Sequence, residues 1–301
     1  MLTMTKIAAV QIEPKLMKIA ENLESILSAA KEAANSGAGL IVFPECSLTG
    51  YIFLSHEEAL PFAESIPGPS TRKIIRLCQE VKVYVILGLL EKEKDKLFNA
   101  AVLLGPQGLI GKYRKNHLPF LGVDRFTDID DEPFRVYETP IGNVGLQICY
   151  DITFPESSRV MALLGADILA LPANFPRGRG EKIITYVVSA RAIENRVHVV
   201  AANRVGSERG YQFAGLSKIV DASGEILGLG SPDKEEIIYA EVNPESARQK
   251  HTIVIPGEWE TDYIRDRRPE LYGEITKPKL DISQGKKGVW HEDKSKRHEL
   301  A

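Results

Sequence analysis

Three side chains with complementary reactivity each follow an apolar stretch of the sequence: Glu45, Lys115 and Cys149. A thiol can attack a carbonyl carbon, a carboxylate can take up the thiol proton, and an ammonium group can stabilise negative charge on oxygen. If the three stretches are strands of one layered fold, their ends can converge at one edge. The placement of Cys149 therefore suits a nucleophile, and Glu45 and Lys115 add a carboxylate and an ammonium group.

Each of these residues also has an ordinary structural interpretation, which is the better one when the residue is taken alone. A free cysteine at a strand end is usually a small buried hydrophobe, a glutamate can cap the following turn, and a lysine is usually a solvated surface charge. A thiol, a carboxylate and an ammonium in one partly buried pocket need one another to offset lost hydration. Such a cluster indicates a functional site.

The elements that must position these residues alternate along the chain. Apolar periodicity and turn signals predict helices over residues 16–34, 70–80, 156–164 and 181–195. The same signals predict strands over residues 6–12, 40–43, 81–90, 99–104, 109–113, 145–148, 167–171, 197–203, 217–220, 225–227 and 237–242. Because no linker or repeat separates them, they predict one layered α/β domain.

A hairpin signal, Gly105-Pro106-Gln107-Gly108, makes the predicted sheet partly antiparallel. Beyond Pro244 the apolar residues follow neither a helix nor a strand period. This arm is expected to pack on its own domain or across a subunit interface. Residues 285–301, rich in Lys, Glu and His, are expected to form a loosely ordered tail.

Composition narrows the class of protein. The 301 residues contain 38 Lys and Arg against 41 Asp and Glu, which gives no electrostatic reason to expect nucleic acid or an anionic membrane as a partner. Neither a signal peptide nor a membrane helix is apparent, so a cytoplasmic protein with a small diffusible substrate is expected. The three cysteines are widely spread, which argues against disulfides and against a metal site.

The segments around the three residues resemble motifs of the nitrilase superfamily of carbon–nitrogen hydrolases. The matching segments are Phe43-Pro44-Glu45 with Thr49-Gly50-Tyr51, Tyr113-Arg114-Lys115 with His117-Leu118, and Cys149-Tyr150-Asp151 with Phe154-Pro155-Glu156. The resemblance covers nearly all of residues 5–245. It implies an α-β-β-α sandwich with mixed sheets, a hydrolase domain over residues 1–245 and a C-terminal extension over residues 246–301.

The resemblance also implies a cofactor-free reaction. Cys149 would attack the carbonyl carbon of a small linear amide or N-carbamoyl compound, and Glu45 would act as general base. Lys115 and the backbone N–H of Tyr150 would hold the oxyanion, and water would then hydrolyse the thioester. A thiol of ordinary pKa is a few per cent ionised at neutral pH, so complete ionisation adds only about 30-fold.

Other roles follow from the resemblance alone. Relatives carry a further acid after the lysine motif, and Asp124 is the nearest candidate. Four residues are expected to line the substrate pocket: Tyr51, Phe126, Asn174 and Phe175. A homodimer or larger even homo-oligomer is expected. The rival functions are a nitrilase or acyltransferase that uses the same three residues, and a catalytically silent binding or scaffold protein.

Overall fold

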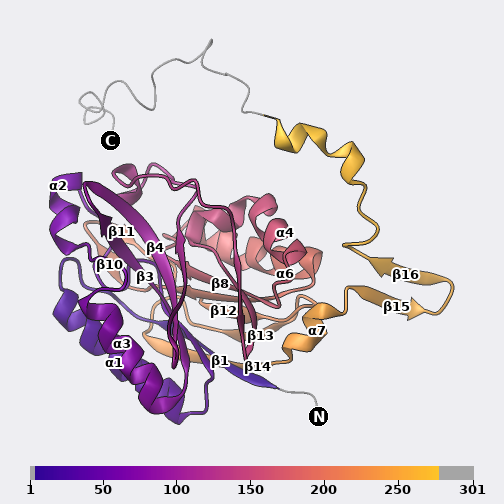
Figure 1. The fold of residues 1–301 in the computed structure, drawn as a ribbon, viewed down its shortest axis with the longest axis horizontal. Helices are drawn as coiled ribbons and strands as arrows, with labels where there is room; N and C mark the ends of the chain where they lie inside the picture. Colours follow the sequence, from indigo (N-terminus) through magenta and orange to yellow (C-terminus); the bar gives the residue numbers. More distant parts are fainter. Residues whose placement is uncertain (1–3, 278–301) are drawn as a thin grey trace. The chain divides into compact units, whose positions relative to one another are not determined.

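The computed structural model describes residues 4–277 of the chain. Two six-stranded sheets pack face to face, and helices lie on their outer surfaces (Figure 1). The inner layer contains apolar side chains of both sheets, such as Ile7, Val42, Leu146 and Ile168. This is the α-β-β-α sandwich with mixed sheets that the sequence predicts, so the predicted fold class is confirmed.

The first sheet has the strand order β14-β1-β2-β3-β4-β5. Strands β1, β2 and β3 run parallel, whereas β4, β5 and β14 each pair antiparallel with their neighbours. The bounds are β14 Glu236–Val242, β1 Thr5–Gln11, β2 Leu40–Val42, β3 Tyr84–Glu93, β4 Lys96–Gly105 and β5 Gly108–Arg114.

The second sheet has the order β13-β12-β9-β8-β7-β6. Its central strands β7, β8 and β9 run parallel, and the strands on either side of them pair antiparallel. The bounds are β13 Ile226–Leu229, β12 Lys218–Val220, β9 His198–Asn203, β8 Ile168–Ala173, β7 Gly142–Leu146 and β6 Val136–Thr139. Parallel strands place their carboxyl ends at one edge of each sheet, where loops can build a site.

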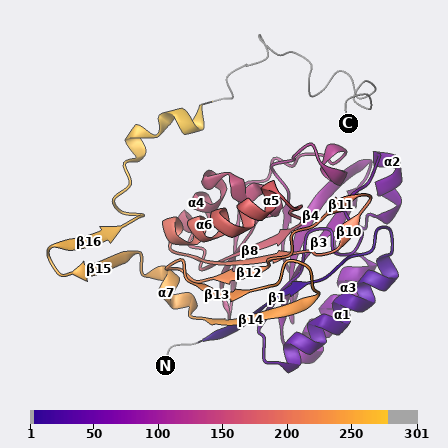
Figure 2. The same ribbon diagram turned by 180° about the vertical axis from the view of Figure 1, so that it is seen from behind.

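Helices cover the outer face of each sheet (Figure 2). Helix α1 (Ile19–Asn35) and helix α3 (Pro69–Val81) pack on the first sheet, and Ala8 and Val10 of β1 contribute to that core. The second sheet is covered by α4 (Pro155–Leu163), α5 (Arg179–Lys182), a π-helical turn (Ile183–Val187) and α6 (Val188–Asn195). Shorter elements are α2 (His56–Ala59) and the hairpin of β10 (Ser207–Glu208) and β11 (Tyr211–Gln212).

The predicted elements agree with the structure except at a few boundaries. Strand β3 begins three residues later than predicted, because α3 continues to Val81 and Lys82 ends it in a left-handed conformation with a φ of 56°. The predicted helix over residues 181–195 is interrupted by the π-helical turn. Strand β6 is not predicted, because its half-buried side chains show no apolar run.

Beyond Pro244, where the sequence shows neither a helix nor a strand period, the structure contains further elements. Helix α7 (Pro244–Arg248) is followed by a hairpin of β15 (His251–Ile255) and β16 (Trp259–Asp262). The hairpin turn contains Gly257 with a φ of 74°. Because consecutive apolar side chains of β15 are exposed, the sequence lacks the alternation that normally indicates a strand.

The chain divides into two compact units, residues 1–264 and residues 265–301. In the second unit the described part contains two short 3₁₀ turns, Pro269–Leu271 and Gly273–Thr276. The predicted domain division at residue 245 stays a prediction, and the predicted tail over residues 285–301 lies outside the described residues. Across residues 4–277 no helix is both long enough and apolar enough to cross a membrane.

Candidate active site

Glu45 is held where β2 leaves the first sheet. The N–H of Phe43 donates to the carbonyl of Ile86, and the N–H of Gly88 donates to the carbonyl of Pro44 at 3.1 Å. The backbone of Glu45 lies so close to β3 that a Cβ added to Gly88 would be 2.5 Å from the Cα of Glu45. The glycine in β3 therefore permits the close approach that buries Glu45 completely.

Lys115 is the first residue after β5, and Asp124 lies in a nearby 3₁₀ turn (Gly122–Arg125). The N–H of Lys115 donates to the carbonyl of Asn99 at 2.8 Å, which continues the pairing with β4. Gly122, with a φ of 52°, lets this turn pack on the ring of Tyr51. The two turns place the ammonium and the second carboxylate beside Glu45.

Cys149 is the third residue after the end of β7 and begins a 3₁₀ turn (Cys149–Thr153). Its backbone is left-handed, with a φ of 46°, which is uncommon for a residue other than glycine. The side chain is almost completely buried. A nucleophile at a sharp turn after a strand is a common arrangement in hydrolases, because the turn presents the reactive atom to the pocket.

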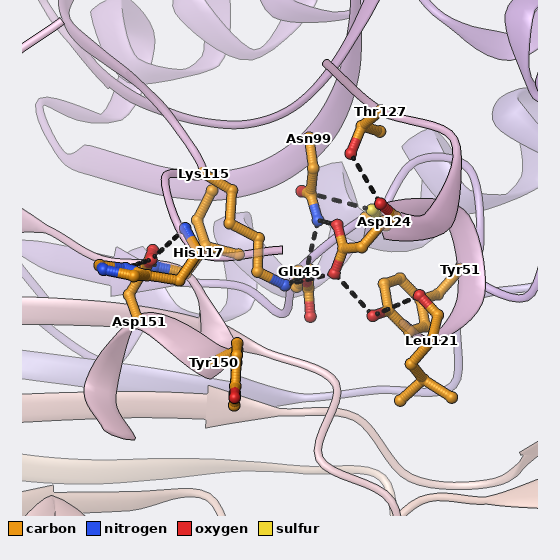
Figure 3. Close-up of polar contacts among 12 residues, drawn as sticks. Glu45, Tyr51, Asn99, Lys115, His117, Leu121, Asp124, Thr127, Tyr150 and Asp151 are labelled. Atoms are coloured by element: carbon orange, nitrogen blue, oxygen red, sulfur yellow. Dashed lines mark hydrogen bonds and ion pairs between the residues drawn. The ribbon is translucent and has the colours of Figure 1, made fainter. Parts of the chain in front are cut away.

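The polar side chains form one buried cluster, which we call the reactive cluster: Glu45, Asn99, Lys115 and Asp124 (Figure 3). Lys115 Nζ lies 2.7 Å from Glu45 Oε1 and 2.6 Å from Asp124 Oδ2. Asn99 Nδ2 lies 2.7 Å from Glu45 Oε1 and 2.8 Å from Asp124 Oδ1. The hydroxyl of Tyr51 donates to Asp124 Oδ2 at 2.7 Å. Glu45 Oε2 is buried and has no hydrogen-bond partner among residues 4–277.

The charges of the reactive cluster do not balance, because two carboxylates face one ammonium. Burial raises the pKa of Glu45, and the charge of Asp124 adds to the rise although Lys115 opposes it. Burial alone would lower the pKa of Lys115, but Asp124 and Glu45 outweigh it and hold that pKa well above its ordinary value. Lys115 therefore stays cationic, and Glu45 is the group that can exchange a proton.

The thiol of Cys149 lies within the electrostatic influence of this cluster. Burial, and after it the negative charge of Glu45, raises the pKa of Cys149 well above its ordinary value, while Lys115 acts in the opposite direction. The expectation of a few per cent thiolate at neutral pH, which assumed an ordinary pKa, is therefore wrong for this site.

Asp151 ties the turn of Cys149 to the loop of Lys115. Its Oδ2 accepts hydrogen bonds from the hydroxyl of Tyr113 at 2.8 Å and from the N–H of Ile148 at 2.9 Å. Its Oδ1 lies 2.7 Å from Nδ1 of His117. Because Tyr113 and His117 flank Lys115, this buried carboxylate fixes the separation between the two turns.

A second buried ion pair supports the opposite side of the site. Arg204 Nη1 lies 2.6 Å from Glu208 Oε2, and both side chains are almost completely buried. Oε1 of Glu208 accepts hydrogen bonds from the N–H groups of Tyr51, at 2.8 Å, and Ile52. The pair thereby holds the loop whose tyrosine donates to Asp124.

The structure brings together some of the predicted site residues and leaves others apart. Glu45, Lys115 and Asp124 are in direct contact, and Tyr51 joins them through its hydroxyl. Tyr150 follows Cys149 in the same turn and lies apart from the reactive cluster (Figure 3).

The remaining predicted residues lie at strand ends and turns. Asn174 follows β8 and is buried, and neither polar atom of its side chain has a partner. The N–H of Phe175 donates to Oδ1 of Asn203 at 2.7 Å. Phe126 ends the turn of Asp124, where the guanidinium of Arg125 lies 4.8 Å from its ring centre. The role of each predicted residue stays a prediction.

Sequence reasoning missed several residues of the site, above all Asn99, Asp151 and the pair of Arg204 and Glu208. Asn99 is a polar residue within the buried, apolar part of strand β4, and such an exception in a buried strand is a usable signal. Within residues 4–277 no group of three or more His, Cys, Asp or Glu side chains is arranged to hold a metal.

Comparisons with known proteins agree with the resemblance seen in the motifs. The family model described as carbon-nitrogen hydrolase matches residues 6–252. A nitrilase from Pyrococcus abyssi is 39% identical over 273 residues, which cover 89% of this chain and 99% of the relative. An omega-amidase from Homo sapiens is 30% identical over 289 residues, which cover 92% of this chain and 100% of the relative.

The solved structures give the same result for the fold. A carbon-nitrogen hydrolase from Helicobacter pylori G27 has a TM-score of 0.81 at 26% identity, and the match covers 92% of this chain and 99% of that one. The predicted resemblance to the nitrilase superfamily is thus confirmed. The chain belongs to the carbon-nitrogen hydrolase family of the nitrilase superfamily.

Proposed function

We propose that this hydrolase cleaves a small linear amide or N-carbamoyl compound to an acid and ammonia, through a thioester at Cys149. One observation carries the proposal: among the described residues, one buried carboxylate oxygen of Glu45 has no partner, although Glu45 Oε1 and both oxygens of Asp124 accept hydrogen bonds within the reactive cluster. A free acceptor whose charge acts on a buried thiol of raised pKa is suited to general-base catalysis.

In the first half of the reaction, Glu45 Oε2 takes the proton of Cys149 as the sulfur bonds to the carbonyl carbon. The carbonyl oxygen becomes an oxyanion, which Lys115 and the N–H of Tyr150 hold. Lys115 has three N–H donors, and its two contacts with carboxylates leave one for the oxyanion. Glu45 then returns the proton to the nitrogen, the carbon–nitrogen bond breaks, and ammonia leaves a thioester.

In the second half, Glu45 takes a proton from water as the water oxygen bonds to the thioester carbon. The carbon–sulfur bond breaks, the acid departs, and Cys149 regains its proton from Glu45. Asp124 takes no part in this transfer, because both of its oxygens already accept hydrogen bonds from Asn99, Lys115 and Tyr51. We assign Asp124 the role of an anchor for the ammonium.

The substrate class follows from the reaction and from the relatives. The relatives include both a nitrilase and an omega-amidase, and the uncharged nitrogen of an amide needs the proton that Glu45 carries. A nitrile or an acyl acceptor other than water remains the rival substrate. A silent scaffold is disfavoured, because burying two carboxylates with one ammonium is costly and serves no purpose without a reaction.

The test is ammonia release from a panel of short aliphatic amides, omega-amides, N-carbamoyl amines and the matching nitriles. The proposal expects amide or carbamoyl cleavage that Cys149→Ala abolishes, a loss of more than about 10³-fold. Cys78→Ala is the matched control, since Cys78 is a buried cysteine in helix α3. Intact mass after rapid acid quenching should show the acyl adduct. Consumption of nitriles alone would support the rival, and no turnover would support the scaffold.

We also propose that the protein forms an even homo-oligomer through the β15–β16 hairpin. Ile253, Val254 and Trp259 of this hairpin are each about half exposed, and a two-stranded hairpin is marginally stable unless something covers it. Light scattering after size exclusion should give a dimer or larger even assembly. Trp259→Glu should shift it to the monomer, and a wild-type monomer would refute the assembly.

A further inference from the structure

Asn99 joins the two carboxylates of the reactive cluster. It lies in β4 and is 1% exposed. Its Nδ2 donates one hydrogen bond to Glu45 Oε1 at 2.7 Å and one to Asp124 Oδ1 at 2.8 Å. An amide NH₂ has two hydrogens, so these contacts use both donors. No motif of the sequence singled out this residue.

The orientation of the amide is fixed by chemistry as well as by distance. Asn99 Oδ1 accepts from the thiol of Cys46, at 3.7 Å from the sulfur. Burial holds the pKa of Cys46 well above its ordinary value, so this thiol keeps its proton and remains a donor. If the amide were turned around, its oxygen would face two carboxylates and its NH₂ would face the thiol. Only the observed orientation satisfies all three neighbours.

The two carboxylate oxygens of Glu45 differ in their contacts. Oε1 accepts from Asn99 and from Lys115, which fills both of its acceptor directions, whereas Oε2 accepts from no protein group. In Figure 3 one oxygen of Glu45 carries no dashed line and points away from Asn99. The two oxygens of this carboxylate are therefore chemically distinct before any substrate binds.

We propose that Asn99 is a positioning residue that occupies Oε1 of Glu45 and so assigns proton transfer to Oε2. This inference rests on the proposed amide hydrolysis and deepens it, because it states which atom receives the thiol proton. Asn99 also keeps Glu45 in its basic form: burial raises the pKa of Glu45, and the hydrogen bond from Asn99 acts against that rise. Asn99 contacts no reacting atom itself.

Two pH profiles test the inference: kcat/KM for the best amide, and the rate at which iodoacetamide alkylates Cys149, followed by peptide mass. Asn99→Ala removes the amide donors. The midpoint of the acid limb of both profiles should therefore shift to a higher pH, by about one pH unit. Asn99→Ser retains one donor and should show a smaller shift. The serine variant also serves if the alanine variant does not fold, as judged by circular dichroism.

The matched control is Asn22→Ala. Asn22 is also a buried amide whose Nδ2 donates twice, but to the carbonyls of Lys15 and Leu48, away from any carboxylate. A general loss of packing would lower rates in both variants without moving the acid limb. Unshifted midpoints in the folded Asn99 variants would overturn the inference. If the alkylation midpoint moves but no amide is hydrolysed, the effect of Asn99 on proton uptake by Glu45 is upheld and the proposed function fails.

Discussion

Two buried ion clusters lie on either side of Tyr51, and they differ in how fully their groups are satisfied. Arg204 and Glu208 are matched one to one, and both oxygens of Glu208 accept hydrogen bonds. In the reactive cluster two carboxylates share one ammonium, and Glu45 Oε2 has no partner. Tyr51 joins the clusters, because its N–H donates to Glu208 and its hydroxyl to Asp124.

This difference in hydrogen bonding distinguishes a charged pair that stabilises the fold from a charged cluster that can react. Removing either group of a complete buried ion pair lowers stability, because the remaining charge has lost both its hydration and its partner. A buried cluster with excess negative charge holds a carboxylate of raised pKa, which is ready to accept a proton. Burial alone, which the two clusters share, does not distinguish them.

The largest expected effect is on stability at the complete pair. Arg204→Met should lower the free energy of unfolding by about 3–5 kcal/mol, because it leaves Glu208 charged and buried without its cationic partner. Urea unfolding monitored by circular dichroism measures this. Adding Glu208→Leu should recover only part of the loss, since the N–H groups of Tyr51 and Ile52 then lack an acceptor. If wild type and Arg204→Met were equally stable, the pair of Arg204 and Glu208 would not have the structural role that distinguishes it from the reactive cluster.

The next effect is on rate at the incomplete cluster. Lys115→Met should reduce kcat by about 10² to 10³, as the loss of an oxyanion donor does in other enzymes. Lys112→Met is the control, because Lys112 also pairs with a buried glutamate, Glu91, but lies outside the reactive cluster. Steady-state ammonia release compares the two. Near-normal turnover of Lys115→Met would show that the oxyanion is held by other groups.

A pH profile sharpens the comparison further. Glu45 must be ionised to act, and its pKa is raised above the ordinary 4.5, so kcat/KM should fall on acidification with a midpoint above that value. The pKa values of Cys149 and Lys115 are also raised, so no inflection should appear between pH 8 and the ordinary thiol value of 9.0. An uncharged aliphatic amide is the suitable substrate. A rise near pH 8.5 would instead indicate an independent thiolate.

The same shift has a consequence for stability. Because the folded-state pKa of Glu45 lies above 4.5, the folded protein holds this proton more tightly than the unfolded chain. The resulting stabilisation is complete below pH 4.5 and is lost as the pH rises through the folded-state pKa. Glu45→Gln should remove this contribution to the pH dependence, which thermal unfolding at several pH values would detect.

The smallest effect is expected at a third, exposed pair. Arg209 contacts Glu58 at 2.7 Å on the hairpin next to Glu208, but both side chains are more than a quarter exposed. Arg209→Ala should change the free energy of unfolding by about 0–1 kcal/mol and leave kcat unchanged. If Arg209→Ala lowered the free energy of unfolding as much as Arg204→Met, the contribution of a one-to-one ion pair to stability would not depend on its burial.

The sequence predicted the layered fold because strand and helix periods are strong in the core elements. Residues 40–42 and 168–173 are buried on both faces, as parallel strands between layers are, and their apolar runs are continuous. It also predicted that Glu45 and Lys115 converge from the ends of separate strands, and the structure places them in contact. Their catalytic roles remain predictions.

Partners that depend on tertiary contact could not be predicted. The bonds from Asn99 to Glu45 and Asp124 join residues 54 and 25 positions apart, and the bond from Glu208 to Tyr51 spans 157 positions. Nothing in local periodicity specifies such pairs. The exposed apolar residues of β15 were missed for a different reason, because exposure of consecutive apolar residues contradicts the alternation on which strand prediction depends.

The left-handed backbone at Cys149 restricts which nucleophiles this scaffold can use. A second substituent on Cβ clashes with the main chain at a φ of 46°, so a β-branched residue is strongly disfavoured there. Sulfur or a primary alcohol is compatible with the turn, but the secondary alcohol of threonine is not. Among side chains that carry a thiol or an aliphatic hydroxyl, this geometry therefore favours cysteine and serine over threonine at position 149.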